Sequence, residues 1–328
     1  MKELIQNFPQ QLEEALKIGQ SYKFKNAVKP VANIVLTGLG GSGIGGSIVQ
    51  NFVADKLKVP FVVNKDYALP KFVGPETLVI VCSYSGNTEE TLDAMKQAIK
   101  AKAKVVGITS GGEVAAISET NKLDCILVPA GFPPRACIGY SIVQILYVLR
   151  RYKLLKEKFD QDIQASIELL KENTKDLQKK AKTIAQKLNG KLPIIYSGAG
   201  YEGLAIRVRQ QFNENGKILC WHNAIPEMNH NELVGWRQKD DNKVVLLLRN
   251  DDDFERTKLR MEINKKVIKK YTPNIIEVVS KGNSYWERIF YFIHLTDWVS
   301  VFIADLNGND ATEVQVINEL KGALAKVN

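Results

Sequence analysis

The sequence predicts an α/β protein with two tandem domains, each built on a parallel sheet that is flanked by helices on both faces. Short apolar segments alternate with helical segments over the first half of the chain, which is typical of parallel sheets with right-handed crossovers. A Lys-rich helical stretch without Gly or Pro follows at residues 152–188. The order of strand, Gly-x-Gly turn and helix at residues 32–52 then returns at residues 192–212, which indicates a duplicated domain.

The first domain is expected at residues 1–152. Its N-terminal segment is charged and amphipathic and lacks an apolar core, which predicts a helix rather than a secretory signal. Helices are also expected at residues 46–57 and 88–103. The apolar segments expected to form strands are residues 32–38, 59–65, 77–85, 104–110 and 123–130. Ligands of such sheets bind beyond the carboxyl ends of the strands, so the site is expected there.

The second domain is expected at residues 153–328. After the connecting helices and the repeated strand, turn and helix, further strands are expected within residues 243–253 and 274–284. The most apolar run, residues 289–306, is interrupted by three polar residues, which predicts a buried helix and not a membrane span. They are His294, Thr296 and Asp297.

The composition is that of an ordinary globular protein and disfavours several classes of function. The 328 residues include 45 Lys and Arg and 36 Asp and Glu, which gives a formal charge of +9. The Lys residues are spread along helices, so nucleic-acid binding is not expected. The four cysteines lack Cys-x-x-Cys spacing, so neither a zinc site nor a disulfide framework is expected, and the reduced cytoplasm is the expected location. They are Cys82, Cys125, Cys137 and Cys220.

A glycine-rich segment, VLTGLGGSGIGG, follows directly from the first predicted strand. Gly38, Gly40 and Gly43 match the Gly-x-Gly-x-x-Gly pattern of dinucleotide sites, and Asp66 is spaced as the acid that would hold a ribose. Backbone N–H groups at the start of a helix bind any phosphate, however. A third interpretation is that the glycines only permit a tight turn and close helix packing. This segment alone leaves all three open.

The segment CSYSGNTEET favours a phosphate monoester over a dinucleotide. Ser83, Ser85 and Thr88 cluster around Gly86 at a predicted turn from strand to helix. Several hydroxyls and exposed N–H groups suit the three terminal oxygens of a phosphate monoester. A nicotinamide enzyme has no need of this second anion site. The simpler interpretation, a helix N-cap by Asn87 or Thr88, would require only one such side chain.

These two segments carry a resemblance to a known family. SYSGNTEET resembles the phosphate loop of the sugar isomerase (SIS) domain, and GLGGSGIGG resembles its first loop, which implies substrate contacts by Gly41 and Ser42. Two such domains in tandem resemble the phosphoglucose isomerase superfamily. Four further motifs resemble its bifunctional phosphoglucose/phosphomannose isomerases. They are PRACIGY at 134–140, FNENGK at 212–217, NHNELVGW at 229–236 and DATEVQVINELK at 310–321.

The resemblance implies an aldose–ketose isomerase that interconverts glucose 6-phosphate, mannose 6-phosphate or both with fructose 6-phosphate through a cis-enediolate. It implies that Glu214 is the base, that His230 handles the ring oxygen and that Arg135 stabilises the enediolate. Lys321 would assist ring opening, and Thr312 would leave room for rotation about C2–C3. It also implies a homodimer whose subunits share the site, with hexose 6-phosphates as substrates. No cofactor, metal ion, nucleic acid or membrane is expected as a partner.

Taken without the resemblance, several of these residues have simpler interpretations. Glu214 lies just after a predicted helix and would be a solvated carboxylate. Arg135 follows two prolines and would form a surface ion pair. Lys321 lies on a terminal amphipathic helix and would be solvated. Of the other two histidines, His294 is expected in the core, and His222 is expected to be structural.

Three alternative functions are weighed against the isomerase. A non-catalytic sugar-phosphate sensor would use the same loops but usually carries a DNA-binding module, for which the residues before the first strand are too few. An NAD-dependent oxidoreductase would use the glycine pattern. An aminosugar synthase would need a glutaminase half, for which we expect no room in this chain.

Overall fold

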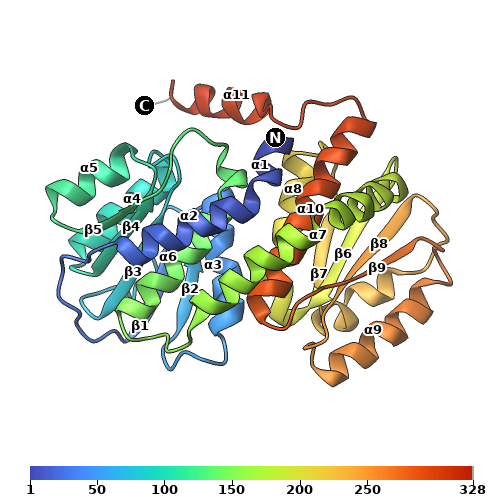
Figure 1. Ribbon diagram of the computed structural model, residues 1–328, viewed down its shortest axis with the longest axis horizontal. Coiled ribbons are helices and arrows are strands. Elements are labelled where there is room, and N and C mark those ends of the chain that lie inside the picture. Colours follow the sequence, from blue (N-terminus) through green and yellow to red (C-terminus); the bar gives the residue numbers. More distant parts are fainter. Residues whose placement is uncertain (327–328) are drawn as a thin grey trace.

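Two parallel β-sheets lie side by side, with helices packed between them and on their outer faces (Figure 1). The computed structural model describes residues 1–326. The first sheet has the strand order β2-β1-β3-β4-β5, and the second has the order β7-β6-β8-β9. Every pair of neighbouring strands is parallel. The predicted fold class, two tandem α/β domains, is therefore confirmed.

The strands follow the predicted apolar segments closely, with one exception. Strand β7 was not predicted, because its polar residues His222 and Asn223 break the apolar pattern. The strands of the first sheet are β1 Asn33–Thr37, β2 Phe61–Asn64, β3 Thr77–Cys82, β4 Lys104–Thr109 and β5 Asp124–Leu127. Those of the second sheet are β6 Leu192–Gly198, β7 Trp221–Ile225, β8 Lys243–Arg249 and β9 Ile275–Val279.

The helices include three that the sequence did not predict, namely α5, α6 and α9. The helices are α1 Lys2–Gln6, α2 Phe8–Ser21, α3 Gly40–Val53, α4 Glu89–Lys100, α5 Gly112–Thr120, α6 Ile138–Arg151, α7 Phe159–Leu188, α8 Glu202–Glu214, α9 Glu255–Ile268, α10 Tyr285–Leu306 and α11 Gln315–Leu324. Short 3₁₀ turns are η1 Pro134–Ala136, η2 Ala199–Tyr201, η3 Glu227–His230 and η4 Glu232–Gly235.

Helix α3 begins at Gly40, within the glycine run and well before the predicted start at residue 46. Four of its glycines, at positions 41, 43, 45 and 46, face neighbours that leave no room for a side chain. A Cβ atom at Gly43 would lie 2.1 Å from the Gly38 carbonyl oxygen, and one at Gly46 would lie 2.5 Å from Leu36 Cδ2. Close packing of the helix on β1 therefore outweighs the low helix propensity of glycine.

One continuous hydrophobic core joins the two halves of the protein. Helices α2, α3 and α6 cover the inner face of the first sheet, and α7, α8 and α10 cover the inner face of the second. Helices α4 and α5 cover the outer face of the first sheet, and α9 covers that of the second. The predicted domain boundary, between residues 152 and 153, falls between α6 and α7, and it stays a prediction.

The last two helices differ sharply in their environment. Helix α10 is long and apolar enough to cross a membrane, but 83% of its apolar window is buried within the protein, as predicted for a core helix. Helix α11 has no buried residue and lies at the edge of the structure (Figure 1). Its apolar side chains are exposed, with Val316 at 78% and Leu320 at 60%.

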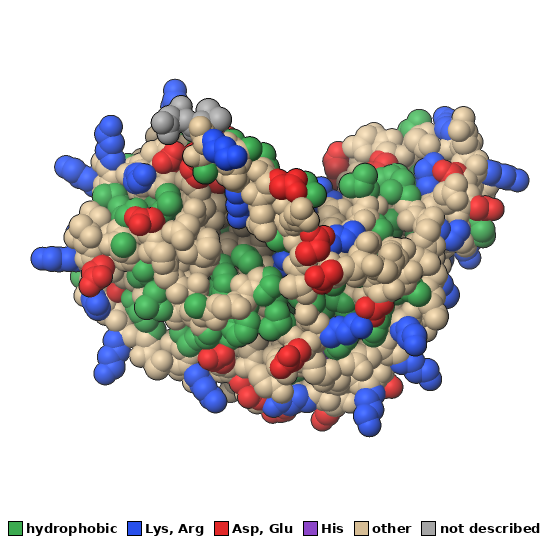
Figure 2. Space-filling view, turned by 90° about the horizontal axis from the view of Figure 1, so that it is seen from above, with side chains coloured by type: hydrophobic (Ala, Val, Ile, Leu, Met, Phe, Trp, Pro, Cys, Tyr) green, Lys and Arg blue, Asp and Glu red, His purple; other side chains and the backbone are tan. Residues whose placement is uncertain are grey.

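Charged side chains do not gather into a single basic surface on the face seen from above. Figure 2 shows Lys and Arg side chains spread around the rim of this face, with Asp and Glu between them. This face therefore lacks the continuous basic stripe that is typical of nucleic-acid-binding surfaces.

Candidate active site

The loop after β1 and the 3₁₀ turn η1 meet at the carboxyl edge of the first sheet. Gly41 packs against the backbone before Arg135, since a Cβ atom here would lie 2.8 Å from the Pro134 carbonyl oxygen. The next residue, Ser42, accepts a hydrogen bond on Oγ from the backbone N–H of Tyr84, over 2.9 Å. This contact joins the loop after β1 to the loop after β3, and it leaves the Ser42 hydroxyl proton free to donate.

The loop after β3 holds the three predicted hydroxyls. Gly86 has a φ of +72°, which a side chain would strain. Ser83 Oγ lies 3.0 Å from Thr88 Oγ1, and Ser85 Oγ accepts the Asn87 backbone N–H over 3.2 Å. Thr88 is the residue before α4, but its side chain does not cap the helix. Its hydroxyl proton and the first N–H groups of α4 can therefore donate to an anion.

Arg135 is the centre of a buried hydrogen-bond network. Its side chain, in η1, is only 4% exposed. Nε donates to Asn215 Oδ1 over 2.6 Å, and Nη2 donates to the carbonyl oxygens of Ala311 and Thr312, each over 2.8 Å. Nη1 lies 3.8 Å from Glu214 Oε2. Burial lowers the pKa of Arg135, and the neighbouring Glu214 carboxylate opposes that change, so the guanidinium stays cationic.

A buried ion pair between Arg207 and Asp297 contacts the main chain of Arg135. Arg207 Nη2 donates to the Arg135 carbonyl oxygen over 2.8 Å and to Asp297 Oδ2 over 3.1 Å. Gln211 Nε2 donates to Asp297 Oδ1 over 2.8 Å. These three residues were not predicted, because the contacts join α8 to α10 across a long stretch of sequence. The available signal was an aspartate within the apolar run of α10.

Glu214 lies at the end of α8, with its side chain 27% exposed. Lys217 Nζ donates to the Glu214 carbonyl oxygen over 2.7 Å and forms an ion pair with Glu313 Oε1 over 3.1 Å. Lys217 thereby ties the segment that carries Glu214 to the segment that carries Thr312. The structure brings Arg135, Glu214 and Thr312 together, with the backbone before Arg135 packed against the loop after β1.

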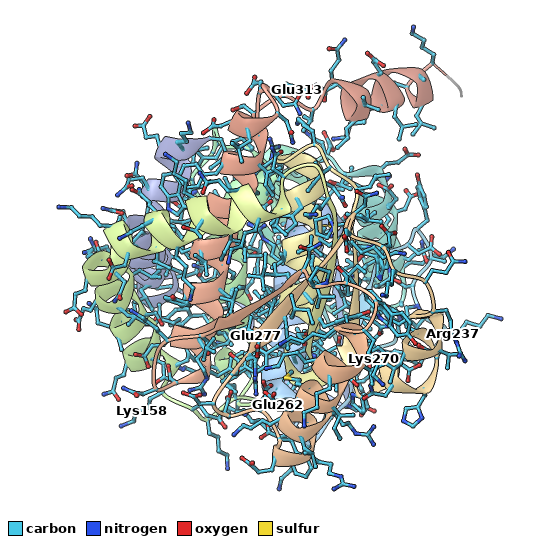
Figure 3. The ribbon with its side chains drawn as sticks, turned by 90° about the vertical axis from the view of Figure 1, so that its right-hand side faces the viewer. Lys158, Arg237, Glu262, Lys270, Glu277 and Glu313 are labelled. Carbon is cyan, nitrogen blue, oxygen red and sulfur yellow. The ribbon has the colours of Figure 1, made fainter. Side chains whose placement is uncertain are left out.

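Lys321 and His230 are not brought to this cluster within one chain. Lys321 lies on the exposed helix α11. His230 is exposed in η3, beyond the carboxyl end of β7. Helix α8 starts near the carboxyl ends of the strands of the second sheet and runs back along the sheet for about 18 Å, at 1.5 Å per residue. Glu214, at the end of α8, therefore lies near the amino ends of these strands, whereas η3 lies beyond their carboxyl ends. In Figure 3, Glu313 lies at the top and Arg237 lies well below it, at the right-hand side.

The other two histidines lie outside the cluster. His294 is fully buried in α10, where its Nε2 accepts the Trp298 indole N–H over 3.0 Å, and burial lowers its pKa to about 4. The prediction of a core histidine is confirmed. His222 is half-buried on β7, and burial lowers its pKa as well. A neutral imidazole is favoured at both positions.

Residues 1–326 contain no group of three or more His, Cys, Asp or Glu side chains that could hold a metal ion. The four cysteines are unpaired, and burial raises the pKa of Cys82, Cys137 and Cys220 to about 12. Such thiols are poor nucleophiles and poor metal ligands at neutral pH.

Family models match both halves of the chain. Residues 29–132 match the SIS domain, and residues 177–324 match the bacterial phospho-glucose isomerase C-terminal SIS domain. A solved tagatose-6-phosphate ketose/aldose isomerase from Escherichia coli has the same fold, with a TM-score of 0.72 at 17% identity over 95% of each chain.

Relatives of similar length share much more of the sequence. A bifunctional phosphoglucose/phosphomannose isomerase from Caldicellulosiruptor bescii is 38% identical over 100% of this chain and 99% of its own length. The protein of that name from Aquifex aeolicus is 39% identical over 90% of this chain and 92% of its own length. The chain therefore belongs to the family of bifunctional phosphoglucose/phosphomannose isomerases, within the SIS-domain enzymes.

Proposed function

We propose that the chain interconverts glucose 6-phosphate and mannose 6-phosphate with fructose 6-phosphate at one site, by proton transfer through a cis-enediolate. The observation that carries this proposal is the position of Arg135 Nη1, 3.8 Å from Glu214 Oε2. Arg135 follows Pro134, which packs against the loop after β1, and that loop is hydrogen-bonded to the hydroxyl-rich loop after β3. A carboxylate and a fixed guanidinium next to an anion site are the groups that this reaction requires.

The 6-phosphate is proposed to bind between the starts of α3 and α4. Gly41 and Ser42 would contact it from one side, and Ser83, Ser85 and Thr88 from the other. Their hydroxyls and the free backbone N–H groups can supply hydrogen bonds to all three terminal oxygens. Two helix N-termini add positive potential at the same point.

Glu214 and Arg135 are proposed to perform the proton transfer. The Glu214 carboxylate takes the proton from C2 of the open-chain aldose phosphate, which leaves a cis-enediolate, and it returns that proton to C1. The proton on O2 passes to O1 in the same conversion, so that the carbonyl group moves from C1 to C2. Arg135 stabilises the negative charge on the enediolate oxygens. Its bonds to Asn215, Ala311 and Thr312 hold the guanidinium in place before substrate arrives, so little reorganisation is required.

His230 is proposed to reach the site from a second copy of the chain, where it would handle the ring oxygen. Its separation from Glu214 by the length of α8 supports this arrangement. The exposed apolar side chains of α11 are a further reason to expect a homodimer, because such side chains are usually covered. Lys321 would assist ring opening from the same helix. Given unpaired cysteines, we expect the dimer to work in the cytoplasm.

The test is an assay of the purified protein on fructose 6-phosphate without added nicotinamide, with glucose 6-phosphate and mannose 6-phosphate read separately. We expect both aldose phosphates to accumulate. A protein that binds fructose 6-phosphate without turnover would instead be a sugar-phosphate sensor. Turnover that requires a nicotinamide cofactor would favour an oxidoreductase. Either result would contradict the proposal.

A further inference from the structure

The structure assigns a positioning role to Tyr84, which fixes the segment presenting Arg135 against the loop that binds phosphate. This inference rests on the proposed isomerase function. Tyr84 lies in the loop after β3, between Ser83 and Ser85, and nothing in the proposed chemistry uses its side chain. Its contacts nevertheless reach the loops after β1, β4 and β5.

The main chain of Tyr84 ties together three loops at the carboxyl edge of the first sheet. Its N–H donates to Ser42 Oγ over 2.9 Å, in the loop after β1. Its carbonyl oxygen accepts from Ser110, over 2.9 Å from the backbone N–H and over 2.6 Å from Oγ, in the loop after β4. These contacts shape the phosphate loop, and they do not depend on the side chain of Tyr84.

The phenol of Tyr84 makes a separate set of contacts, to the loop after β5. Its O–H donates to the Pro129 carbonyl oxygen over 2.8 Å and accepts the Phe132 backbone N–H over 3.1 Å. Burial raises the pKa of Tyr84 well above its usual range, so the phenol stays neutral and keeps both bonds. Phe132 precedes Arg135 by three residues, with only Pro133 and Pro134 between them.

The two prolines make this anchor effective. Proline fixes its own φ angle and restricts the residue before it, so a displacement at Phe132 passes along a stiff segment to Arg135. Pro134 also packs against Gly41, so the segment from Phe132 to Arg135 is held both by the Tyr84 phenol and by the loop after β1. The phenol therefore positions Arg135, the group proposed to stabilise the enediolate, whereas the main chain of Tyr84 shapes the loop proposed to bind the phosphate.

Tyr84→Phe separates these two effects, because it removes only the phenol contacts. Both phenol hydrogen bonds are lost, and the one to Phe132 is the one that bears on Arg135. We therefore expect kcat for fructose 6-phosphate to fall about tenfold, with KM nearly unchanged. A matched control is Tyr22→Phe. The Tyr22 hydroxyl oxygen accepts a hydrogen bond from the Cys125 backbone N–H over 2.9 Å. Cys125 lies at the beginning of β5, so this contact is at the amino ends of the strands, away from the proposed site. This control should leave both constants unchanged.

A binding experiment adds a measurement that a loss of stability would not change. The affinity for inorganic phosphate measures binding at the phosphate loop alone. A five-carbon hydroxamic acid with a terminal phosphate mimics the enediolate, so its affinity also depends on Arg135. For Tyr84→Phe we expect unchanged affinity for inorganic phosphate and about tenfold weaker binding of the hydroxamate. Equal kcat in the Tyr84 and Tyr22 variants, or a loss of phosphate affinity with kcat retained, would overturn the positioning role. A wild-type protein without turnover would contradict the proposed function instead.

Discussion

Arg135 and Glu214 lie with Nη1 and Oε2 3.8 Å apart, although they belong to different halves of the chain. Arg135 is held at the carboxyl edge of the first sheet by η1, and Glu214 ends a helix of the second domain. The continuous core that joins the two sheets is what fixes this distance. The catalysis proposed for this pair would therefore depend on the packing between the domains as much as on either domain alone.

The phosphate loop can be tested by removing its hydroxyls. Each of Ser85→Ala and Thr88→Val would remove one proposed hydrogen bond to the phosphate dianion. Such a bond is worth about 1.5–3 kcal/mol, so KM should rise by about tenfold or more. Thr183→Val is a matched control, because the Thr183 hydroxyl only donates to the Lys179 carbonyl oxygen on α7. If KM stays unchanged when both loop hydroxyls are removed together, the phosphate binds elsewhere.

The shared site can be tested by mixing two inactive proteins. Glu214→Gln and His230→Ala should each be inactive alone. If His230 serves the site of the partner, subunit exchange gives hybrid dimers with one site free of both substitutions, and activity should return to about a quarter of the wild-type level for random mixing. Each variant incubated alone is the control. No recovery after demonstrated exchange, or a monomer in sedimentation, would show that the site is not shared.

Thr312 is expected to set the tolerance for both epimers. Its carbonyl oxygen holds Arg135, while its side chain is small. Thr312→Gln would crowd rotation about C2–C3 and should lower kcat/KM for mannose 6-phosphate more than for glucose 6-phosphate. Thr312→Ser keeps a small side chain and should leave kcat/KM unchanged for both epimers. Equal losses for the two epimers in the Gln variant would argue against this role.

His294 should make stability depend on pH. Burial lowers its pKa to about 4, whereas the unfolded residue titrates near 6.5. Between these values only the unfolded chain binds the proton, so the free energy of unfolding falls as the pH decreases. His294→Gln keeps an acceptor for the Trp298 indole N–H but does not titrate. From about pH 7 to about pH 4, wild type should lose about 3 kcal/mol relative to this variant. A constant difference between the two proteins in denaturant titrations would contradict the prediction.

The sequence predicted the parts of the site whose residues are close together in the chain. It did not predict the contacts between residues that are far apart in the chain. The hydroxyls of Ser83, Ser85 and Thr88 lie within six residues, so their grouping could be seen from spacing alone. The Arg207 and Asp297 pair joins residues 90 positions apart, and no local pattern indicates it. Strand β7 was missed because two consecutive polar residues, His222 and Asn223, break the apolar pattern. The start of α3 was missed because packing outweighs helix propensity there.

The most direct test of the central claim is the yield of both aldose phosphates from fructose 6-phosphate by wild type and by Glu214→Gln. Gln keeps the size and hydrogen bonding of the side chain but removes its basicity. Because one base is proposed to serve both epimers, kcat should fall at least about 100-fold for both products, with substrate binding retained. Glu202→Gln, at the exposed beginning of the same helix, is the matched control and should behave as wild type. Loss of both products in Glu214→Gln alone is the predicted result, and near-normal formation of either product in that variant would contradict the account.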